Sequence, residues 1–100
     1  MTEVPIYLFA KDQITLHVPV TKGVYILYNR YKDVIYYGKT DVNLYSRILA
    51  HYKGDEGSCT QDAKYFSFRF VDDPSAEERS LLSAFKTVFG KLPKCNDQLG

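Results

Sequence analysis

The tyrosines of this sequence are its first candidates for chemistry. Five of them fall in one stretch, GVYILYNRYKDVIYYGKT, which begins at residue 23. We expect a hairpin here in which Tyr28 lies opposite Asp33. In that register Tyr25 faces Tyr36, with their Cβ atoms about 5 Å apart. A phenol has a pKa of about 10, so it accepts a proton at neutral pH only where cations such as Lys39 lower that pKa.

Two predicted helices add side chains suited to phosphate and metal chemistry. Arg47 and His51 are four residues apart, so on a helix they lie on the same side, at the rim of its apolar face. The forked guanidinium of Arg47 can neutralise a phosphate, and the pKa of histidine suits general-base work. Glu78 falls in the middle of the apolar stripe of the last helix. A carboxylate aimed at the core side is costly unless it is paired or binds a metal.

Strands are expected on both sides of the tyrosine-rich stretch. Residues 5–18 alternate apolar and polar side chains around a polar break, which predicts an N-terminal β-hairpin. Residues 23–29 and 34–37 are predicted as the strands of the second hairpin. Residues 65–71 are predicted as a half-buried strand, with Phe66, Phe68 and Phe70 facing in and Ser67 and Arg69 facing out.

Two helices follow from capping residues and apolar periodicity. Asp41 is a good N-cap for a helix that ends near Lys53. Its apolar arc is formed by Leu44, Tyr45, Ile48, Leu49 and Tyr52. The last helix begins at Asp73, with Pro74 at its first position, or at Ser75. Gly90 is its natural end.

Composition and charge limit the class of protein. The 100 residues are 45% hydrophobic and 25% charged, which is typical of one globular domain over residues 1–100. A net charge of +1 gives weak support for nucleic-acid binding, although cations exceed acids between Lys22 and Lys64. Cys59 and Cys95 lie far apart, which favours inert, reduced thiols and a cytoplasmic protein. We find no signal peptide or membrane span in the sequence.

Together these motifs resemble the GIY-YIG nuclease superfamily over residues 22–96. The two strand motifs are Gly23-Val24-Tyr25 and Tyr36-Tyr37-Gly38, followed by Lys39-Thr40. Leu44, Arg47 and His51 match the LxxRxxxH pattern of the first helix. Glu78, Leu81 and Leu82 match an ExxLI-like segment of the last helix, and Pro93 and Asn96 match the closing P-x-x-N. Val24 and Tyr37 are conservative departures from the usual residues, and one extra residue precedes Leu44.

The resemblance implies an α+β fold, a small antiparallel three-stranded sheet flanked by helices, to which this chain adds its N-terminal hairpin. It also implies metal-dependent hydrolysis of phosphodiester bonds in DNA, one strand per site, with water as the nucleophile. Glu78 would hold one Mg²⁺ or Mn²⁺ ion. The implied catalytic residues are Tyr25, Tyr36, Lys39, Arg47, His51, Glu78 and Asn96. The candidate nucleic-acid contacts are Lys22, Lys39, Arg47 and Lys53.

The general base has three candidates. Tyr25 is the first, with Tyr36 positioning water and phosphate. His51 is the second, because its pKa lies near neutrality without any help from its surroundings. Lys39 is the third, provided that it loses its proton.

Several alternatives stay open on the sequence alone. If Ser75 caps the last helix, Glu78 completes a capping box with it and needs no metal. The fold could also serve as a catalytically inactive module that binds nucleic acid or a protein partner in a repair or mobile-element complex. RNA is the alternative to DNA, and a separate protein is the alternative source of specificity. A nucleoid-associated location is expected if the protein is bacterial or from a phage.

Overall fold

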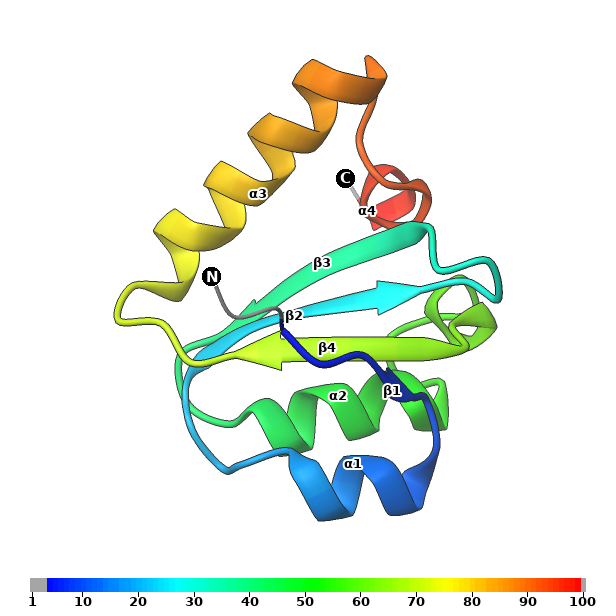
Figure 1. Cartoon of the computed structure of the whole chain (residues 1–100), viewed down its shortest axis with the longest axis vertical. Helices are drawn as coiled ribbons and strands as arrows, with labels where there is room; N and C mark the ends of the chain where they lie inside the picture. Colours follow the sequence, from blue (N-terminus) through cyan, green and yellow to red (C-terminus); the bar gives the residue numbers. More distant parts are fainter. Residues whose placement is uncertain (1–3, 100) are drawn as a thin grey trace.

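The computed structural model describes residues 4–99 of the chain. Its centre is a four-stranded sheet in the order β1-β4-β2-β3, in which every pair of neighbours is antiparallel (Figure 1). The elements are β1 (Tyr7–Leu8), α1 (Lys11–His17), β2 (Gly23–Tyr28), β3 (Val34–Thr40), α2 (Leu44–Lys53), η1 (Thr60–Asp62), β4 (Tyr65–Arg69), α3 (Pro74–Phe89) and α4 (Lys94–Leu99). The expected antiparallel sheet flanked by helices is confirmed, and the short β1 makes its fourth strand.

Helices cover both faces of the sheet. Figure 1 shows α1 and α2 on one face, with α3 and α4 on the other. Ser67, which was predicted to face solvent, lies on the second face and is only 1% exposed. Its hydroxyl is 2.9 Å from that of Tyr28. Phe66 is buried as predicted, whereas Phe70 follows the end of β4 and is 59% exposed.

The predicted N-terminal hairpin over residues 5–18 is wrong. Its first half is β1, which pairs with β4, and its second half is the helix α1. Ile14 and Val18 are buried while Leu16, between them, is 72% exposed. Because Ile14 and Val18 are four apart, the same residues that alternate as a strand also share one side of a helical turn. Packing of this turn against α2 therefore decides the structure.

The predicted register of the second hairpin is also wrong. Tyr25 pairs with Gly38 and Leu27 pairs with Tyr36, with an irregularity between Leu27 and Tyr28. Tyr25 and Tyr36 are therefore diagonal neighbours on one face rather than directly opposed residues. Aromatic side chains reach each other across such a diagonal.

The ends of the two long helices follow from their caps. Asn43, not Asp41, caps α2, and its side chain accepts a hydrogen bond from the Ser46 amide at 2.9 Å. Asp73 caps α3 with Pro74 at its first position, as one of the two predicted starts requires. Gly90 ends α3 with a φ of 77°, the left-handed conformation that favours glycine. No helix within residues 4–99 is long and apolar enough to cross a membrane.

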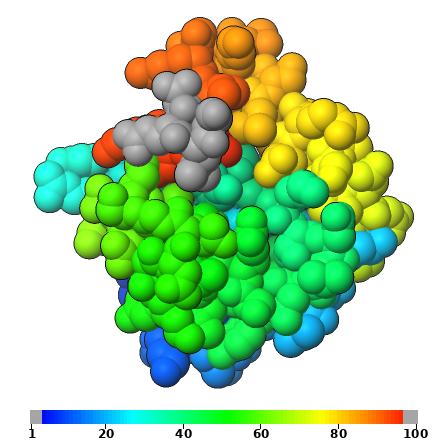
Figure 2. Space-filling view, turned by 180° about the vertical axis from the view of Figure 1, so that it is seen from behind, coloured from blue at the N-terminus to red at the C-terminus, as the bar shows by residue number. Residues whose placement is uncertain are grey.

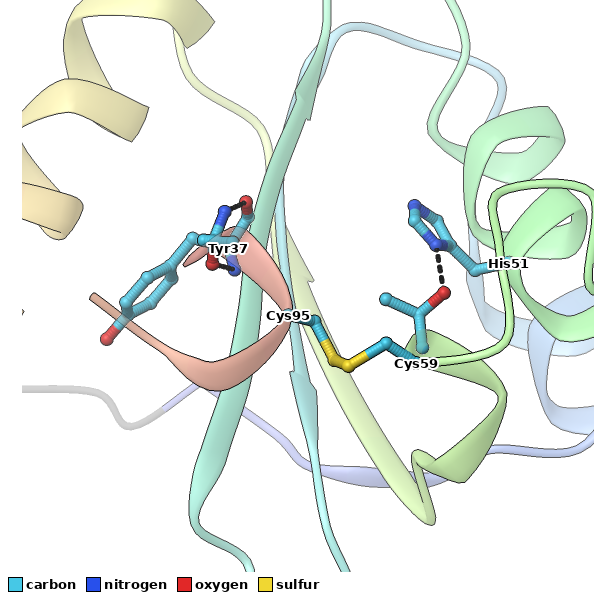
Figure 3. Close-up of a disulfide and its surroundings, with 6 residues drawn as sticks. Tyr37, His51, Cys59 and Cys95 are labelled. Atoms are coloured by element: carbon cyan, nitrogen blue, oxygen red, sulfur yellow. Dashed lines mark hydrogen bonds between the residues drawn. A yellow bond between two sulfur atoms is a disulfide. The ribbon is translucent and has the colours of Figure 1, made fainter. Parts of the chain in front are cut away.

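The two cysteines are bonded to each other, so the prediction of free, reduced thiols is wrong. Cys59 lies just before η1 and Cys95 lies in α4, and their Cα atoms are 5.7 Å apart. Figure 3 shows this bridge between the loop and α4. A separation of 36 residues and no metal-type spacing gave no sign of this contact in the sequence.

Candidate active site

A buried pair of side chains from β2 and α2 forms the centre of the candidate site. The hydroxyl of Tyr25 lies 2.7 Å from Nε2 of His51. Tyr25 is 0% exposed and His51 is 1% exposed. On the helix, His51 was predicted at the rim of the apolar face, but it faces the core together with Leu44 and Ile48. Burial of both polar groups is tolerated because each satisfies the other.

Gly38 makes room for the ring of Tyr25. A Cβ atom at residue 38 would lie 2.2 Å from Cζ of Tyr25 and 2.4 Å from its hydroxyl oxygen. Any larger residue on β3 would therefore push the phenol off His51. Gly38 of the second strand motif thus leaves space for the ring of Tyr25 in the first motif, and this packing explains why the sequence contains both residues.

Burial holds this pair in its neutral form. Burial, followed by the Arg47 charge, lowers the pKa of His51 to about 4. Burial, followed by the neighbouring Tyr36, raises the pKa of the Tyr25 phenol well above its ordinary value, and the nearby Arg47 guanidinium opposes this rise. At neutral pH the phenol therefore keeps its proton and the imidazole is uncharged.

Tyr36 completes an aromatic cluster at the edge of this pair. Its ring centroid lies 6.1 Å from that of Tyr25 and 5.0 Å from that of His51. With 8% of its surface exposed, Tyr36 is closer to solvent than Tyr25. Burial and the negative charge of Glu78 raise the pKa of its phenol. The structure thus brings together the two predicted phenols although their register differs from the expected one.

Arg47 lies between this cluster and a shallow surface cleft. The cleft has a volume of about 590 Å³ and is lined by Lys39, Thr40, Val42, Asn43, Ser46, Arg47 and Ala50. Lys39 and Arg47 give it two cations, while Asp41 lies 3.7 Å from the Lys39 ammonium. A cleft with this lining can accept a phosphate group.

Glu56 is a residue of this region that the sequence did not predict. Its Oε1 lies 2.9 Å from Nη1 of Arg47, and both side chains are partly exposed. The Glu56 carboxylate therefore occupies part of the guanidinium of Arg47. The acidic loop between Gly54 and Gly57 was the available signal, but nothing in its spacing linked it to Arg47.

Glu78 faces the site from α3. Asp73 caps that helix, so the capping box with Ser75 does not form and no longer explains Glu78. Burial raises the pKa of this half-buried carboxyl, and the charges of Lys39 and Arg47 oppose the rise. Its neighbour Glu77 instead pairs with Arg69. Figure 2 shows α2 in green, β3 in teal and α3 in yellow to orange meeting on one surface of the molecule.

The donors around Glu78 fit a weakly held, hydrated cation. Within the described part of the chain, no group of three or more His, Cys, Asp or Glu side chains is placed to hold a metal. Mg²⁺ is commonly bound by one or two carboxylates and keeps several waters, with substrate phosphates completing its coordination. A single half-buried carboxylate beside a cleft with two cations is compatible with that mode and not with a closed, all-protein metal cage.

The remaining predicted residues lie farther from the cluster. Oδ1 of Asn96 accepts a hydrogen bond from the Tyr37 amide, and Nδ2 donates one to the Tyr37 carbonyl, each at 2.9 Å. Asn96 thus binds the main chain next to Tyr36 rather than entering the cleft. Lys22 donates to the Asp72 carbonyl at 2.9 Å, beside Phe70. Lys53 is exposed at the end of α2.

Thr60 is the second residue that the sequence missed. Its Oγ1 lies 2.8 Å from Nδ1 of His51, and the residue is 1% exposed. The only available signal was a hydroxyl in a polar loop, which is too common to single out.

A larger groove, of about 730 Å³, lies elsewhere between the β2–β3 turn, the end of α3 and the start of α4. Tyr37, Phe85, Phe89 and Pro93 are among its lining residues, together with Lys32, Lys91 and Lys94. It contains none of the residues of the aromatic cluster and lacks Glu78. The smaller cleft is not lined by the aromatic cluster or by Glu78 either, but Lys39 and Arg47 line it, so it is the candidate site for a phosphate.

Comparison with known proteins points the same way as this geometry. A search of curated proteins gave no match. A family model described as the GIY-YIG catalytic domain matches residues 21–79 of the 100-residue chain. That range includes Tyr25, Tyr36, Arg47, His51 and Glu78, and it ends before Asn96. Because the match covers more than half of the sequence, this chain belongs to the GIY-YIG family.

Proposed function

We propose that this protein is a metal-dependent endonuclease that hydrolyses phosphodiester bonds of DNA, one strand per site, with water as the nucleophile. The family is one of nucleases, which supports a nucleic acid as the partner. The observation that carries the proposal is the buried Tyr25–His51 pair beside a cleft with two cations, with the Glu78 carboxylate facing the same cations.

Each residue of the site has a separate role in the proposed reaction. Arg47 and Lys39 bind the phosphate oxygens and neutralise their charge. Glu78 holds one Mg²⁺ or Mn²⁺ ion, which when bound stabilises charge on the phosphate and the leaving oxygen. Asn96 supports the site by fixing the main chain beside Tyr36.

Proton transfer in this scheme runs through the buried pair. As water attacks, its proton passes to the Tyr25 oxygen, and the Tyr25 proton passes to Nε2 of His51. The phenol thus stays neutral throughout and the charge appears on the imidazole. The lowered pKa of His51 opposes this step, and a substrate phosphate that neutralises Arg47 removes the part of that lowering caused by the Arg47 charge. Because Tyr25 is fully buried, this route requires a substrate phosphate to draw Arg47 away from the phenol. Tyr36 is the alternative acceptor, since it lies closer to solvent.

Nicking of supercoiled plasmid with and without Mg²⁺ tests the proposal. We expect Glu78→Ala to lower the rate by about 100-fold or more, because the carboxylate that holds the ion is lost. Glu77→Ala is the matched control, since it removes the neighbouring carboxylate, which pairs with Arg69. Equal activity of the two variants would refute a role of Glu78 in metal binding.

Separate Tyr25→Phe and Tyr36→Phe variants identify the proton acceptor. General-base groups typically contribute about 10²–10⁴-fold to the rate. We expect Tyr25→Phe to lose an amount in this range under single-turnover conditions, and Tyr36→Phe to lose less. The opposite order would assign the proton to Tyr36, and full activity of both variants would exclude a phenol as the acceptor.

One observation favours a second function, a binding module without turnover. Tyr25 is fully buried in the free protein, as a purely structural tyrosine would be. Such a module would bind plasmid or short duplex DNA in a gel-shift experiment while producing no nicks with Mg²⁺ or Mn²⁺. Nicking that depends on Glu78 would exclude it.

A further inference from the structure

The second nitrogen of His51 has a partner whose role the scheme above does not include. Thr60 Oγ1 lies 2.8 Å from Nδ1, on the side of the ring opposite to Tyr25. Both residues are 1% exposed, so water does not substitute for this contact. A neutral imidazole carries one N–H, and the bond made by one nitrogen determines the state of the other.

The direction of these hydrogen bonds matters for proton transfer. His51 can receive the Tyr25 proton only if Nε2 is bare, which requires the hydrogen to be on Nδ1. Thr60 Oγ1 can accept a hydrogen bond from that Nδ1–H, before and after Nε2 is protonated. Burial raises the pKa of the Tyr25 phenol and the nearby Arg47 opposes it. Because the phenol therefore keeps its proton, it can donate that proton to a bare Nε2.

The position of Thr60 depends on a short, largely exposed segment. Asp55, Gly57, Ser58, Gln61 and Asp62 are all exposed. Apart from Ala63, which lies in the core, and Cys59, which packs against it, few apolar side chains hold this segment, and such segments are among the least stable parts of a fold. Thr60 itself begins the 3₁₀ turn η1.

A covalent bond next to Thr60 ties this segment to the other side of the site. Cys59 is bonded to Cys95 in α4, and the next residue, Asn96, makes two hydrogen bonds to the main chain of Tyr37. Figure 3 shows the bridge between these two contacts, with His51 on one side and Tyr37 on the other. One disulfide thus connects the segment that contacts His51 to the helix α4, whose Asn96 is hydrogen-bonded to the main chain of β3.

We propose that Thr60 is a positioning residue that keeps His51 in its Nδ1–H form, and that the Cys59–Cys95 disulfide keeps Thr60 in place. Reduction by a dithiol transfers two electrons and two protons: the S–S bond breaks, two thiols form, and the dithiol closes to its own disulfide. The freed loop then no longer holds Thr60 against His51. For its effect on catalysis, this inference rests on the proposed nuclease function.

Nitrogen NMR of the histidine side chains tests the positioning role without any substrate. The chain has two histidines, and His17 serves as the internal reference. We expect a protonated Nδ1 and a bare Nε2 on His51 in the oxidised wild type and in Thr60→Ser. Thr60→Val, which lacks the hydroxyl, should show a mixture of both neutral forms, as should the wild type after reduction. A bare Nδ1 in the wild type, or an unchanged spectrum in Thr60→Val, would refute the proposal.

Single-turnover plasmid nicking tests the consequence for catalysis. We expect Thr60→Val to lower the rate about tenfold with unchanged DNA binding, and Thr60→Ser to stay near the wild-type rate. Dithiol treatment should slow the wild type by a similar factor and should not change a Cys59→Ser/Cys95→Ser double variant, which starts slow. Circular dichroism before and after reduction confirms that each protein remains folded.

The two experiments distinguish failure of the nuclease function from failure of this inference. If the wild type does not nick DNA at all, the nuclease function is wrong, while the NMR result still decides the role of Thr60. If the wild type nicks DNA equally well in its oxidised and reduced forms, the role of the disulfide is wrong although the nuclease function stands.

Discussion

The guanidinium of Arg47 forms an ion pair with Glu56, which a substrate phosphate would have to displace in the proposed function. Exposed ion pairs like that with Glu56 contribute about 0–1 kcal/mol. The same contact competes directly with a phosphate for the guanidinium. In the free protein, one of its own acids therefore occupies the guanidinium that we propose as the phosphate ligand.

Replacing Glu56 should strengthen substrate binding. We expect Glu56→Gln to lower KM for plasmid or duplex DNA by about two- to fivefold with little change in kcat, because only the competing contact is lost. Asp55→Asn is the matched control for loop charge, since Asp55 is exposed. An equal decrease of KM in both variants would indicate long-range charge and not release of Arg47.

His51 makes the folded protein sensitive to acid. Its pKa is lowered from 6.5 to about 4, mainly by burial. Between these values the unfolded chain takes up a proton that the folded chain does not, so stability falls as pH falls. From pH 6.5 to 4 we expect the free energy of unfolding to decrease by on the order of 3 kcal/mol from this residue alone.

Urea unfolding at a series of pH values measures this effect. His51→Gln should lose this part of the pH dependence, while His17 is retained in both proteins. Parallel curves for the wild type and the variant over this range would contradict a buried, neutral His51.

At the scale of elements, the fit between β2 and β3 depends on Gly38. We expect Gly38→Ala to cost about 3 kcal/mol of stability and to abolish nicking, because its Cβ would overlap the ring of Tyr25. Thermal unfolding and the plasmid assay measure the two effects.

Gly57→Ala is the matched control for this substitution. Gly57 has a φ of 101°, and among the described residues beyond its chain neighbours no atom lies within 4 Å of the point that an alanine Cβ would occupy. Only backbone strain of about 1 kcal/mol is therefore expected. This variant should keep its activity. Equal loss of activity in both variants would show that the Tyr25 ring does not require the space above Gly38.

Elements with strong local signals were predicted well from the sequence. Both ends of α3 follow from Asp73, Pro74 and Gly90, whose preferences are local. The N-terminal segment was misassigned because Ile14 and Val18 satisfy the period of a strand and that of a helix. In such short segments tertiary contacts determine whether a strand or a helix forms, and these contacts cannot be inferred from the sequence pattern.

The residues of the site also differ in how well the sequence predicts them. The residues of the family motifs converge on one region because they lie on strands and helices with fixed spacing. Glu56, Thr60 and the Cys59–Cys95 bond belong to a loop whose path is set by packing. No periodicity applies to such a loop, so its contacts become visible only in three dimensions.

At the scale of the whole molecule, a net charge of +1 leaves DNA binding to a few local cations. Each phosphate contact gives a slope of about −0.9 in a plot of log affinity against log salt. With Lys39 and Arg47 at the cleft, we expect a slope of about −2 for DNA binding at low to moderate salt. A flat salt dependence would argue against contacts with the phosphate backbone.

Two lysine variants show which cations produce this salt dependence. Lys39→Ala should reduce its magnitude by about 1, because it removes one cation from the cleft. Lys22→Ala should leave it nearly unchanged, since the Lys22 ammonium is bound to the Asp72 carbonyl. Equal effects would place Lys22 on the path of the DNA as well.

The hydrogen bonds of Asn96 have a further consequence for how copies of this protein behave toward one another. β3 is a border strand of the sheet, and unpaired main-chain groups on a border strand invite pairing with another chain. Asn96 occupies the amide and the carbonyl of Tyr37 at that border, and α4 packs there. The opposite border, β1, has only two residues. Within residues 4–99, neither border therefore offers a long free template, which disfavours aggregation through sheet extension.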